Sequence, residues 1–338
     1  MHKSPKTALA AVAGLALALT LAACGGPAAS PSPTPSDPAT ATPTETATPT
    51  PTATPTPITP STSLDGITVT GDAGAAPTVT VPSPWAIDQT RRSVLVEGNG
   101  PAAEGDSIVE VNYVGTNGRT GEVFDSSWQR GTHGLFSLDQ VVPGFTKGLT
   151  GAKPGERVLI GMPGADGYDA SGGSPDAGIE VGDSLVFLVD VIAVSTKTAV
   201  GTPASPSLPV TVGEDGGKPT VSIPAGATPP ANLVAESVIV GAQRPVAATD
   251  YVMVRYRTWS WKTGQMIEDV YEAPEAGQLA RLIPGWQKGL VGKPIGSRVV
   301  IVAPPADAYP QGNATPAIEA GDTLVYTVDI LFSSSVTG

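Results

Sequence analysis

The sequence contains an internal repeat with a period of about 140 residues. Val-Pro-Gly-Phe at 142–145 returns as Ile-Pro-Gly-Trp at 283–286, and Gly-Asp-Ser-Leu-Val-Phe at 182–187 returns as Gly-Asp-Thr-Leu-Val-Tyr at 321–326. The two offsets, 141 and 139 residues, differ by a small insertion or deletion. Because solenoid repeats have periods of about 20–50 residues, this pattern predicts two homologous domains in tandem.

The first repeat is placed at 64–200 and the second at 201–338. Each repeat opens with a segment in which threonine and valine alternate, at 67–86 and at 209–228. Such alternation favours extended structure, so we expect a strand or two that pack on the edge of each domain.

Within each repeat the hydrophobic pattern predicts mainly strands. Val109, Val111 and Tyr113 alternate with polar residues, as in a half-buried strand whose other face meets solvent. The only segments with a helical signature are about eight residues long, at 144–151 and 285–292, each preceded by a proline and closed by a glycine. About five antiparallel strands around one short helix make an α+β domain.

The N-terminal region predicts export and a membrane anchor. Residues 1–23 combine a positively charged start with an apolar run at 8–21 that is short for a membrane span, which is typical of a signal peptide. The Leu-Ala-Ala that precedes Cys24 resembles the lipobox of bacterial lipoproteins, in which the cysteine is lipidated. Residues 24–63 are then a Thr/Pro-rich stalk, since 27–60 hold eleven prolines and eleven threonines.

Composition excludes several function classes. The net charge of −12 and the lack of a basic stripe argue against a nucleic-acid partner. Cys24 is the only cysteine, and His133 is the only histidine after the signal peptide, so neither a disulfide, a zinc site nor a histidine-based triad is expected. We interpret His133 as a solvated loop residue, and no cofactor is indicated.

After these exclusions, the strongest functional signal in the sequence is a set of short motifs that follow one another in the first repeat. It consists of Asn-Tyr-Val-Gly at 112–115, Val-Phe-Asp-Ser-Ser at 123–127, Val-Val-Pro-Gly-Phe at 141–145, Tyr168, and Leu-Val-Phe at 185–187. This order and spacing resembles the FKBP-type peptidyl-prolyl cis-trans isomerases, over nearly all of residues 91–194. The family fold is a bent antiparallel sheet wrapped over a short helix, with the active pocket between them.

The resemblance implies a set of pocket residues in the first repeat. Those implied in catalysis are Tyr113, Phe124, Asp125, Tyr168 and Phe187. Those implied in substrate binding are Phe136, Val141, Val142, Phe145 and Ile179. Most members of the family have tryptophan at the position of Phe145, which forms the floor, so a deeper pocket is expected here.

Aromatic side chains suit this reaction because it needs no nucleophile. Rotation about an X–Pro bond has a barrier of about 18–20 kcal/mol, which is the lost amide resonance. Water stabilises the planar, polar ground state more than the twisted transition state, so a dry pocket lowers the barrier. By resemblance, Tyr168 donates a hydrogen bond to the substrate backbone, and Asp125 orients it without transferring a proton.

The second repeat fits the same frame over about 233–333 but departs at the wall of the pocket. Ile267, Glu268 and Gly277 stand where the first repeat has Phe124, Asp125 and Phe136. The equivalents that remain, expected to bind weakly, are Tyr256, Ile283, Trp286, Tyr309, Ile318 and Tyr326.

These patterns predict an extracytoplasmic prolyl isomerase, lipid-anchored at the outer face of the cell membrane, that acts mainly through its first repeat. Its partners would be unfolded or proline-containing exported polypeptides, and macrolide ligands by resemblance. The alternative is a non-catalytic peptide-binding chaperone or surface adhesion module on the same fold.

Overall fold

The computed structural model describes residues 58–335. The predicted signal peptide, Cys24 and most of the predicted stalk lie outside these residues. Among residues 58–335, no helix is long and apolar enough to cross a membrane.

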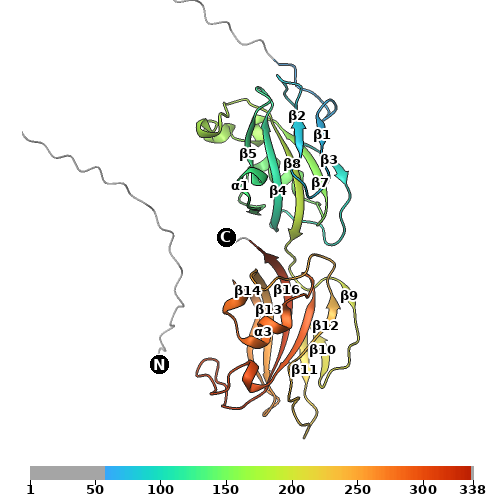
Figure 1. The fold of residues 1–338 in the computed structure, drawn as a ribbon, viewed down its shortest axis with the longest axis vertical. Coiled ribbons are helices and arrows are strands. Elements are labelled where there is room, and N and C mark those ends of the chain that lie inside the picture. The colour runs from blue at the N-terminus through green and yellow to red at the C-terminus, as the bar shows by residue number, and fades with distance from the viewer. Residues whose placement is uncertain (1–57, 336–338) are drawn as a thin grey trace, which may run out of the picture. The chain divides into compact units, whose positions relative to one another are not determined.

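The first repeat is built on one antiparallel sheet of six strands (Figure 1). The strand order is β3-β7-β8-β4-β5, and β6 pairs with a second part of β4. The bounds are β3 (Arg91–Val96), β4 (Ile108–Asn117), β5 (Val123–Ser126), β6 (Gly134–Ser137), β7 (Arg157–Met162) and β8 (Leu185–Val194).

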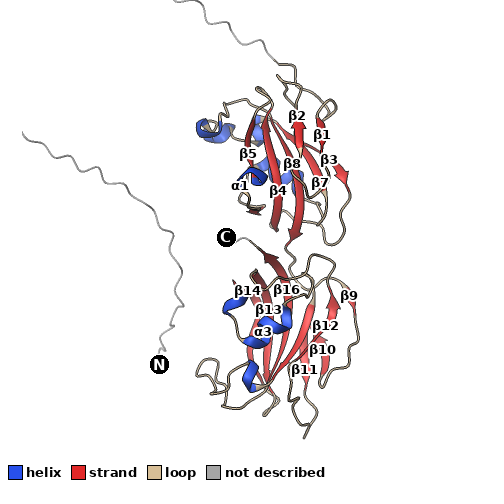
Figure 2. Ribbon diagram, viewed as in Figure 1, coloured by secondary structure: helices blue, strands red, loops and turns tan. Residues whose placement is uncertain are grey.

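The second repeat has a matching six-stranded sheet, in the order β14-β13-β16-β15-β12-β9. One continuous strand, β14, takes the place that β5 and β6 share in the first repeat (Figure 2). The bounds are β9 (Thr202–Pro203), β12 (Val234–Val240), β13 (Tyr251–Ser260), β14 (Met266–Gln278), β15 (Arg298–Ala303) and β16 (Leu324–Ser334).

A seven-residue helix packs on each sheet, α2 (Pro143–Leu149) and α3 (Pro284–Leu290). Each begins at its proline, which has no N–H to leave unpaired in the first turn, and ends two residues before the glycine that the sequence suggested. Five short 3-10 segments add little helix, so the fold is dominated by its sheets; they are Gly164–Asp166, Asp169–Ser171, Pro175–Ala177, Leu279–Arg281 and Pro305–Asp307.

The expectation of one helix per repeat was wrong for the first repeat. A second, four-residue helix α1 (Ser127–Arg130) joins β5 to β6. Ser126 caps it by accepting a hydrogen bond from the Gln129 amide, and Gly131 ends it in the left-handed conformation with φ of 68°. A helix this short has no hydrophobic period, so only its capping residues could have indicated it.

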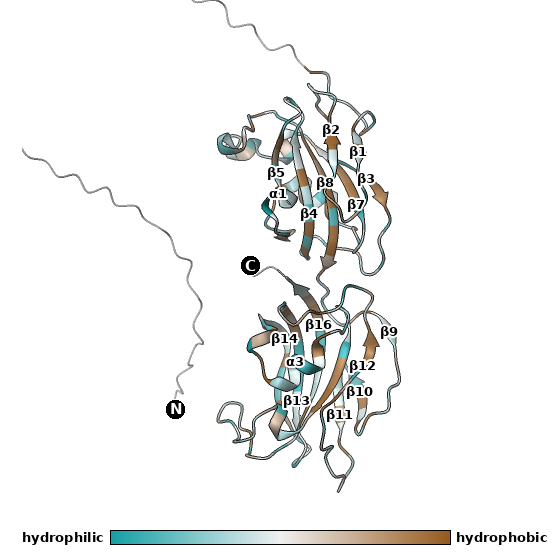
Figure 3. Cartoon of the chain, in the orientation of Figure 1, coloured by the Kyte–Doolittle hydropathy of each residue, from teal (hydrophilic) through white to brown (hydrophobic). Residues whose placement is uncertain are grey.

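The Thr/Val segments form hairpins that cover a face of each sheet. They are β1 (Thr68–Thr70) with β2 (Thr78–Thr80), and β10 (Thr211–Asp215) with β11 (Lys218–Ser222). In the first repeat, Val79 and Trp85 pack on Val114 and Leu188, on the opposite side of the sheet from the helix core. The predicted position at a sheet edge was therefore wrong, because apolar side chains of each sheet pack against the hairpin on one face and against the helix core on the other. Hydrophobic residues accordingly recur along these strands (Figure 3).

A buried ion pair ties the first hairpin to its sheet. The Arg157 guanidinium donates to Asp190 Oδ1 at 2.6 Å and to the Gly71 carbonyl at 2.6 Å, and Asp190 accepts from the Gly74 amide at 2.9 Å. The second repeat keeps the same pair as Arg298 and Asp329.

Strand β4 is buried on both faces, which contradicts the half-buried strand predicted from its alternation. Glu110 is fully buried and lies 3.1 Å from His133 Nδ1, and Asn112 Oδ1 accepts from the Ser127 hydroxyl at 3.0 Å. Helix α1 covers Asn112, whereas Glu110 is enclosed by His133 of the following loop together with Arg244, at 3.2 Å, and Ser335. His133 therefore contacts a carboxylate instead of being merely solvated.

Candidate active site

The first cavity lies between α2 and the facing side of the first sheet and has a volume of about 360 Å³. Nine of the ten residues implied by the sequence line it, together with Gln140, which sequence reasoning missed. Ile179 does not line it and is instead buried in the adjoining core. The lining residues are Tyr113, Phe124, Asp125, Phe136, Gln140, Val141, Val142, Phe145, Tyr168 and Phe187.

The aromatic side chains form one contiguous wall and floor. Phe145, carried by α2 and only 5% exposed, has its ring centroid 5.3 Å from Phe187 and 5.4 Å from Phe136. Phe124 stands edge-on to Phe187 at 5.6 Å, and Tyr113 lies 5.6 Å from Phe136. Edge-to-face contacts in this range are favourable for aromatic pairs, so the rings hold one another in place and keep water out.

Two glycines make room for this wall. A Cβ built at Gly115 would lie 2.6 Å from Phe124 Cζ and 3.0 Å from Phe187 Cε1. A Cβ at Gly134 would lie 2.6 Å from Phe136 Cε2. Since real Cβ contacts essentially never fall below 3.0 Å, the rings occupy their positions only because these two residues lack side chains.

A polar cluster closes one side of the first cavity. The Tyr113 hydroxyl donates to Asp125 Oδ2 at 2.5 Å, and Arg130 Nη2 donates to the same hydroxyl at 2.9 Å. Arg130 also forms an ion pair with Asp125 and lies over the Tyr113 ring. Arg130 was missed by sequence reasoning, because only helix α1 brings it to Asp125.

Electrostatics keep Tyr113 a hydrogen-bond donor. Burial, followed by the hydrogen bond to Asp125, raises the pKa of Tyr113 to about 12, against the opposing effect of Arg130. Burial also raises the pKa of Tyr168. The Tyr168 hydroxyl makes no hydrogen bond to any described residue, so it is available to a ligand.

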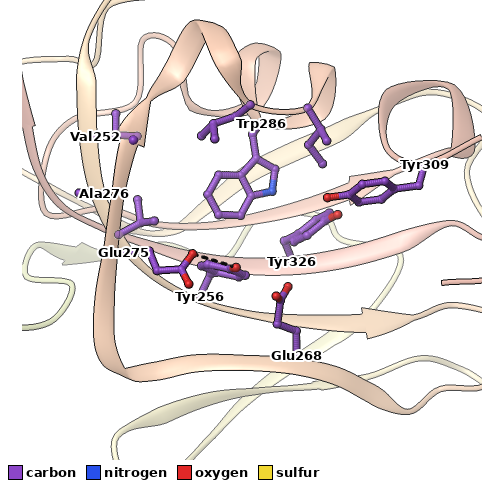
Figure 4. A pocket seen from close by; sticks show the side chains of 12 residues that line it. Val252, Tyr256, Glu268, Glu275, Ala276, Trp286, Tyr309 and Tyr326 are labelled. Carbon is purple, nitrogen blue, oxygen red and sulfur yellow. Dashed lines mark hydrogen bonds between the residues drawn. The ribbon is translucent and has the colours of Figure 1, made fainter. Parts of the chain in front are cut away.

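The second cavity occupies the equivalent place in the second repeat and is smaller, about 150 Å³ (Figure 4). Of the six implied residues, Ile318 is buried in the adjoining core and does not line it, while the other five do. The full lining is Val252, Val254, Tyr256, Glu268, Glu275, Ala276, Gly277, Leu282, Ile283, Trp286, Tyr309 and Tyr326.

Strand register shows how the two walls correspond. Gly115 pairs with Asp125 in the first repeat, and Thr258 pairs with Glu268 in the second. Thr258 therefore takes the position of Gly115, where a side chain would overlap the ring of Phe124 in the first repeat.

The same register places a carboxylate in the second wall. Val111 pairs with Gly134, whereas its equivalent Val254 pairs with Glu275. Two residues further on, Gly277 takes the position of Phe136, so the second wall loses an aromatic ring and gains an acid. Sequence reasoning missed Glu275, because only the register shows its alignment with Gly134.

Comparison with known proteins agrees with this description. The model of the family "FKBP-type peptidyl-prolyl cis-trans isomerase" matches residues 98–192 and 242–331, which confirms the prediction of two homologous domains. The chain is 40% identical over 100 residues to the FK506-binding protein of Streptomyces anulatus, covering 29% of this chain and 80% of that protein. It is 38% identical over 102 residues to the probable FK506-binding protein of Corynebacterium glutamicum, covering 30% and 83%.

A solved structure is also similar in part. The crystal structure of FkpA from Escherichia coli shares 35% identity with this chain at a TM-score of 0.29, and the match covers 31% of this chain and 47% of that one.

Proposed function

Because the chain belongs to the FKBP-type peptidyl-prolyl cis-trans isomerase family, we propose that its first repeat carries most of the isomerase activity and that its second repeat mainly binds peptide. The observation that carries this proposal is the difference between the two cavities. The first has a continuous aromatic wall, and its one carboxylate is paired with Arg130. The second has lost that wall.

The first cavity suits the reaction as a dry, low-polarity surface. A prolyl ring seated on Phe145 would meet Phe136 and Phe187 at its edges and lose its water. The planar amide then loses the solvation that favours it over the twisted state, while the Tyr168 hydroxyl donates a hydrogen bond to a backbone carbonyl of the substrate. Tyr113 keeps its proton, and Asp125 stays paired with Arg130. No proton is transferred in this scheme.

We further propose that the protein works outside the cytoplasm, held at the membrane by a lipid on Cys24. The support is the sequence alone: a signal-like segment at 1–23, a single cysteine after small residues, and a Thr/Pro-rich stalk. The clients would be exported polypeptides, which arrive unfolded with about 10–30% cis at X–Pro bonds. Two relatives are named FK506-binding proteins, so macrolides are candidate inhibitors of the first cavity.

The test is prolyl cis-trans exchange on a short X-Pro peptide, with the protein lacking its leader. We expect Phe124→Ala to lower kcat/KM by about 10- to 100-fold, since burying a phenylalanine contributes about 1.5–3 kcal/mol and 1.4 kcal/mol is tenfold. The matched variant Ile267→Ala should leave the rate unchanged. A folded protein that accelerates nothing, or equal losses in both variants, would contradict the proposal.

A further inference from the structure

The second cavity holds two carboxylates that no cation neutralises. The Glu275 carboxylate accepts from the Tyr256 hydroxyl at 3.3 Å (Figure 4). The Glu268 carboxylate accepts from the Thr258 hydroxyl at 3.3 Å. Within residues 58–335, neither has a lysine, arginine or histidine at ion-pair distance. In the first cavity the one carboxylate has Arg130 beside it.

The two arginines of strand β13, which pairs with β14, are committed elsewhere. Arg257 pairs with Asp269 at 2.8 Å and donates to the Pro219 carbonyl at 3.0 Å. Both Arg255 and Arg257 lie over the ring of Tyr271, which is not part of the cavity lining. These cations therefore do not compensate the acidic pair.

The rest of the cavity provides what an organic cation and a peptide need. Three tyrosines and Trp286 line it, and aromatic faces attract ammonium and guanidinium groups. Trp286 is 6% exposed, and its Nε1 has no hydrogen-bond partner among the described residues. That nitrogen edge is turned toward Tyr326 and Tyr309 (Figure 4), where a ligand carbonyl could accept from it.

We propose that the second cavity binds proline peptides that carry lysine or arginine beside the proline. The cationic side chain lies between Glu268 and Glu275, and the apolar ring lies on Trp286. This inference rests on the proposed peptide-binding role of the second repeat, and it adds the charge of the residues that the repeat selects.

The pKa of Glu268 is raised, first by its burial and then by the charge of Glu275, against the hydrogen bonds from Tyr256 and Thr258. The charge of a bound cation would oppose both effects, since it favours the ionised form of Glu268. Binding should therefore weaken as the pH falls and Glu268 is protonated. The titratable groups that face it from the cavity wall are Glu275, Tyr256, Tyr309 and Tyr326.

The experiment compares three peptides of one design, Ala-Lys-Pro-Lys-Ala and its leucine and glutamate versions. Affinity is measured by calorimetry on the chain lacking its leader. The site is identified by ¹⁹F NMR of protein labelled with 5-fluorotryptophan, with the Trp286 signal assigned from Trp286→Phe. No tryptophan lines the first cavity as described, so a shift of the Trp286 signal reports the second.

We expect the lysine peptide to bind about tenfold tighter than the leucine peptide, as for one close charge pair with an aromatic contact, and the glutamate peptide to bind weakest. The isosteric double variant E268Q/E275Q should abolish that preference and keep leucine-peptide binding. High salt should reduce the preference in the unaltered chain. Prolyl exchange by the first repeat should not change.

Three results would overturn the inference: equal or better binding of the leucine peptide, a lysine preference that survives E268Q/E275Q but is lost in Asp125→Asn, or no shift of the Trp286 signal with any peptide. Thermal unfolding of E268Q/E275Q shows whether that variant is folded. The proposed function fails separately, if the unaltered chain does not accelerate prolyl exchange.

Discussion

In both repeats a seven-residue helix carries an aromatic floor, Phe145 or Trp286, into a cavity, but the strands that face the floor differ. In the first repeat, glycines behind the wall leave space for Phe124 and Phe136. In the second, the positions of those glycines hold Thr258 and Glu275. The wall of the first cavity thus depends on two glycines that are not among its lining residues, so a repeat can lose the wall without losing its fold.

The backbone path differs at the same place. In the first repeat the chain leaves β5, turns through α1 and returns as β6, which brings Arg130 to Asp125. In the second repeat the continuous strand β14 replaces this turn, and no equivalent of Arg130 exists along it. One change of local path therefore removes both the helix and the cation, and the acidic side chains of the second cavity stay unpaired.

The largest effect we expect comes from rebuilding the wall of the second cavity. In a chain silenced by Phe124→Ala, the changes Thr258→Gly, Ile267→Phe and Glu268→Asp together should raise prolyl exchange about tenfold, the lower value for one buried phenylalanine. The control carries Ile267→Phe and Glu268→Asp only. It should gain much less, because the ring would overlap the Thr258 side chain.

Equal gains from the double and triple variants would show that the glycine is not what admits the ring. No gain from either would show that the loss of Phe124 and Asp125 equivalents does not explain the weaker second repeat. Binding of the leucine peptide at Trp286 checks that the triple variant keeps its cavity.

The second-largest effect we expect comes from removing the hydroxyl of Tyr168, the proposed hydrogen-bond donor of the first cavity. Tyr168→Phe should lower kcat/KM by about two- to tenfold, since a hydrogen bond contributes about 0.5–1.5 kcal/mol. Tyr309→Phe, its counterpart in the second repeat, should leave exchange unchanged. Equal losses in the two variants would mean that both repeats turn over substrate.

Removing Arg130 should leave the carboxylate of Asp125 without a cationic partner, as Glu268 and Glu275 are in the second cavity. Arg130→Met should lower exchange by about two- to fivefold, because the pair with Asp125 is partly exposed and such pairs contribute about 0.2–1 kcal/mol. The same variant should gain a preference for lysine-flanked substrates, and Arg130→Lys should restore the original behaviour. A lysine preference that is unchanged in Arg130→Met would contradict this account of the charge difference.

The internal repeat predicted the tandem domains, and the resemblance of the ordered motifs to the isomerase family implied most of the cavity lining. Phe124, Phe136 and Phe145 were identifiable in this way, and so was the floor residue Trp286. Arg130, Gln140 and Glu275 were not, because their places depend on a four-residue helix, a loop and a strand register. Ile179 lies in the core beside the cavity and does not line it, since an apolar residue at this spacing fits either place.

The sequence also predicted the strands of the hairpins but not the surface on which they pack. The alternation in 67–86 predicted extended structure, and β1 and β2 are indeed strands. It could not show that they would lie on the sheet face, because that depends on the apolar outer face of β4, β7 and β8. The buried pair Arg157–Asp190 links the hairpin to the sheet, and only the structure shows this, because Arg157 also donates to the carbonyl of Gly71 in the hairpin.

The smallest effect concerns stability and tests the charge of the second cavity. The folded pKa of Glu268 lies above its ordinary value of 4.5, so between these two values the folded state binds more protons than the unfolded state. Stability contributed by this group therefore falls as the pH rises through that window.

Glu268→Gln removes the charge, so its stability relative to the unaltered chain should grow between a pH below 4.5 and neutral pH. The neighbouring Asp269, whose pKa is lowered from 3.8 mainly by its hydrogen bond with Arg257, gives the opposite control. Asp269→Asn should lose stability relative to the unaltered chain as the pH rises through the window that ends near 3.8, so the lower pH is set below that window. Thermal unfolding midpoints at both pH values measure this. A Glu268→Gln advantage that is absent at neutral pH would mean that the second cavity already neutralises its carboxylates, which would also weaken the case for a cationic ligand.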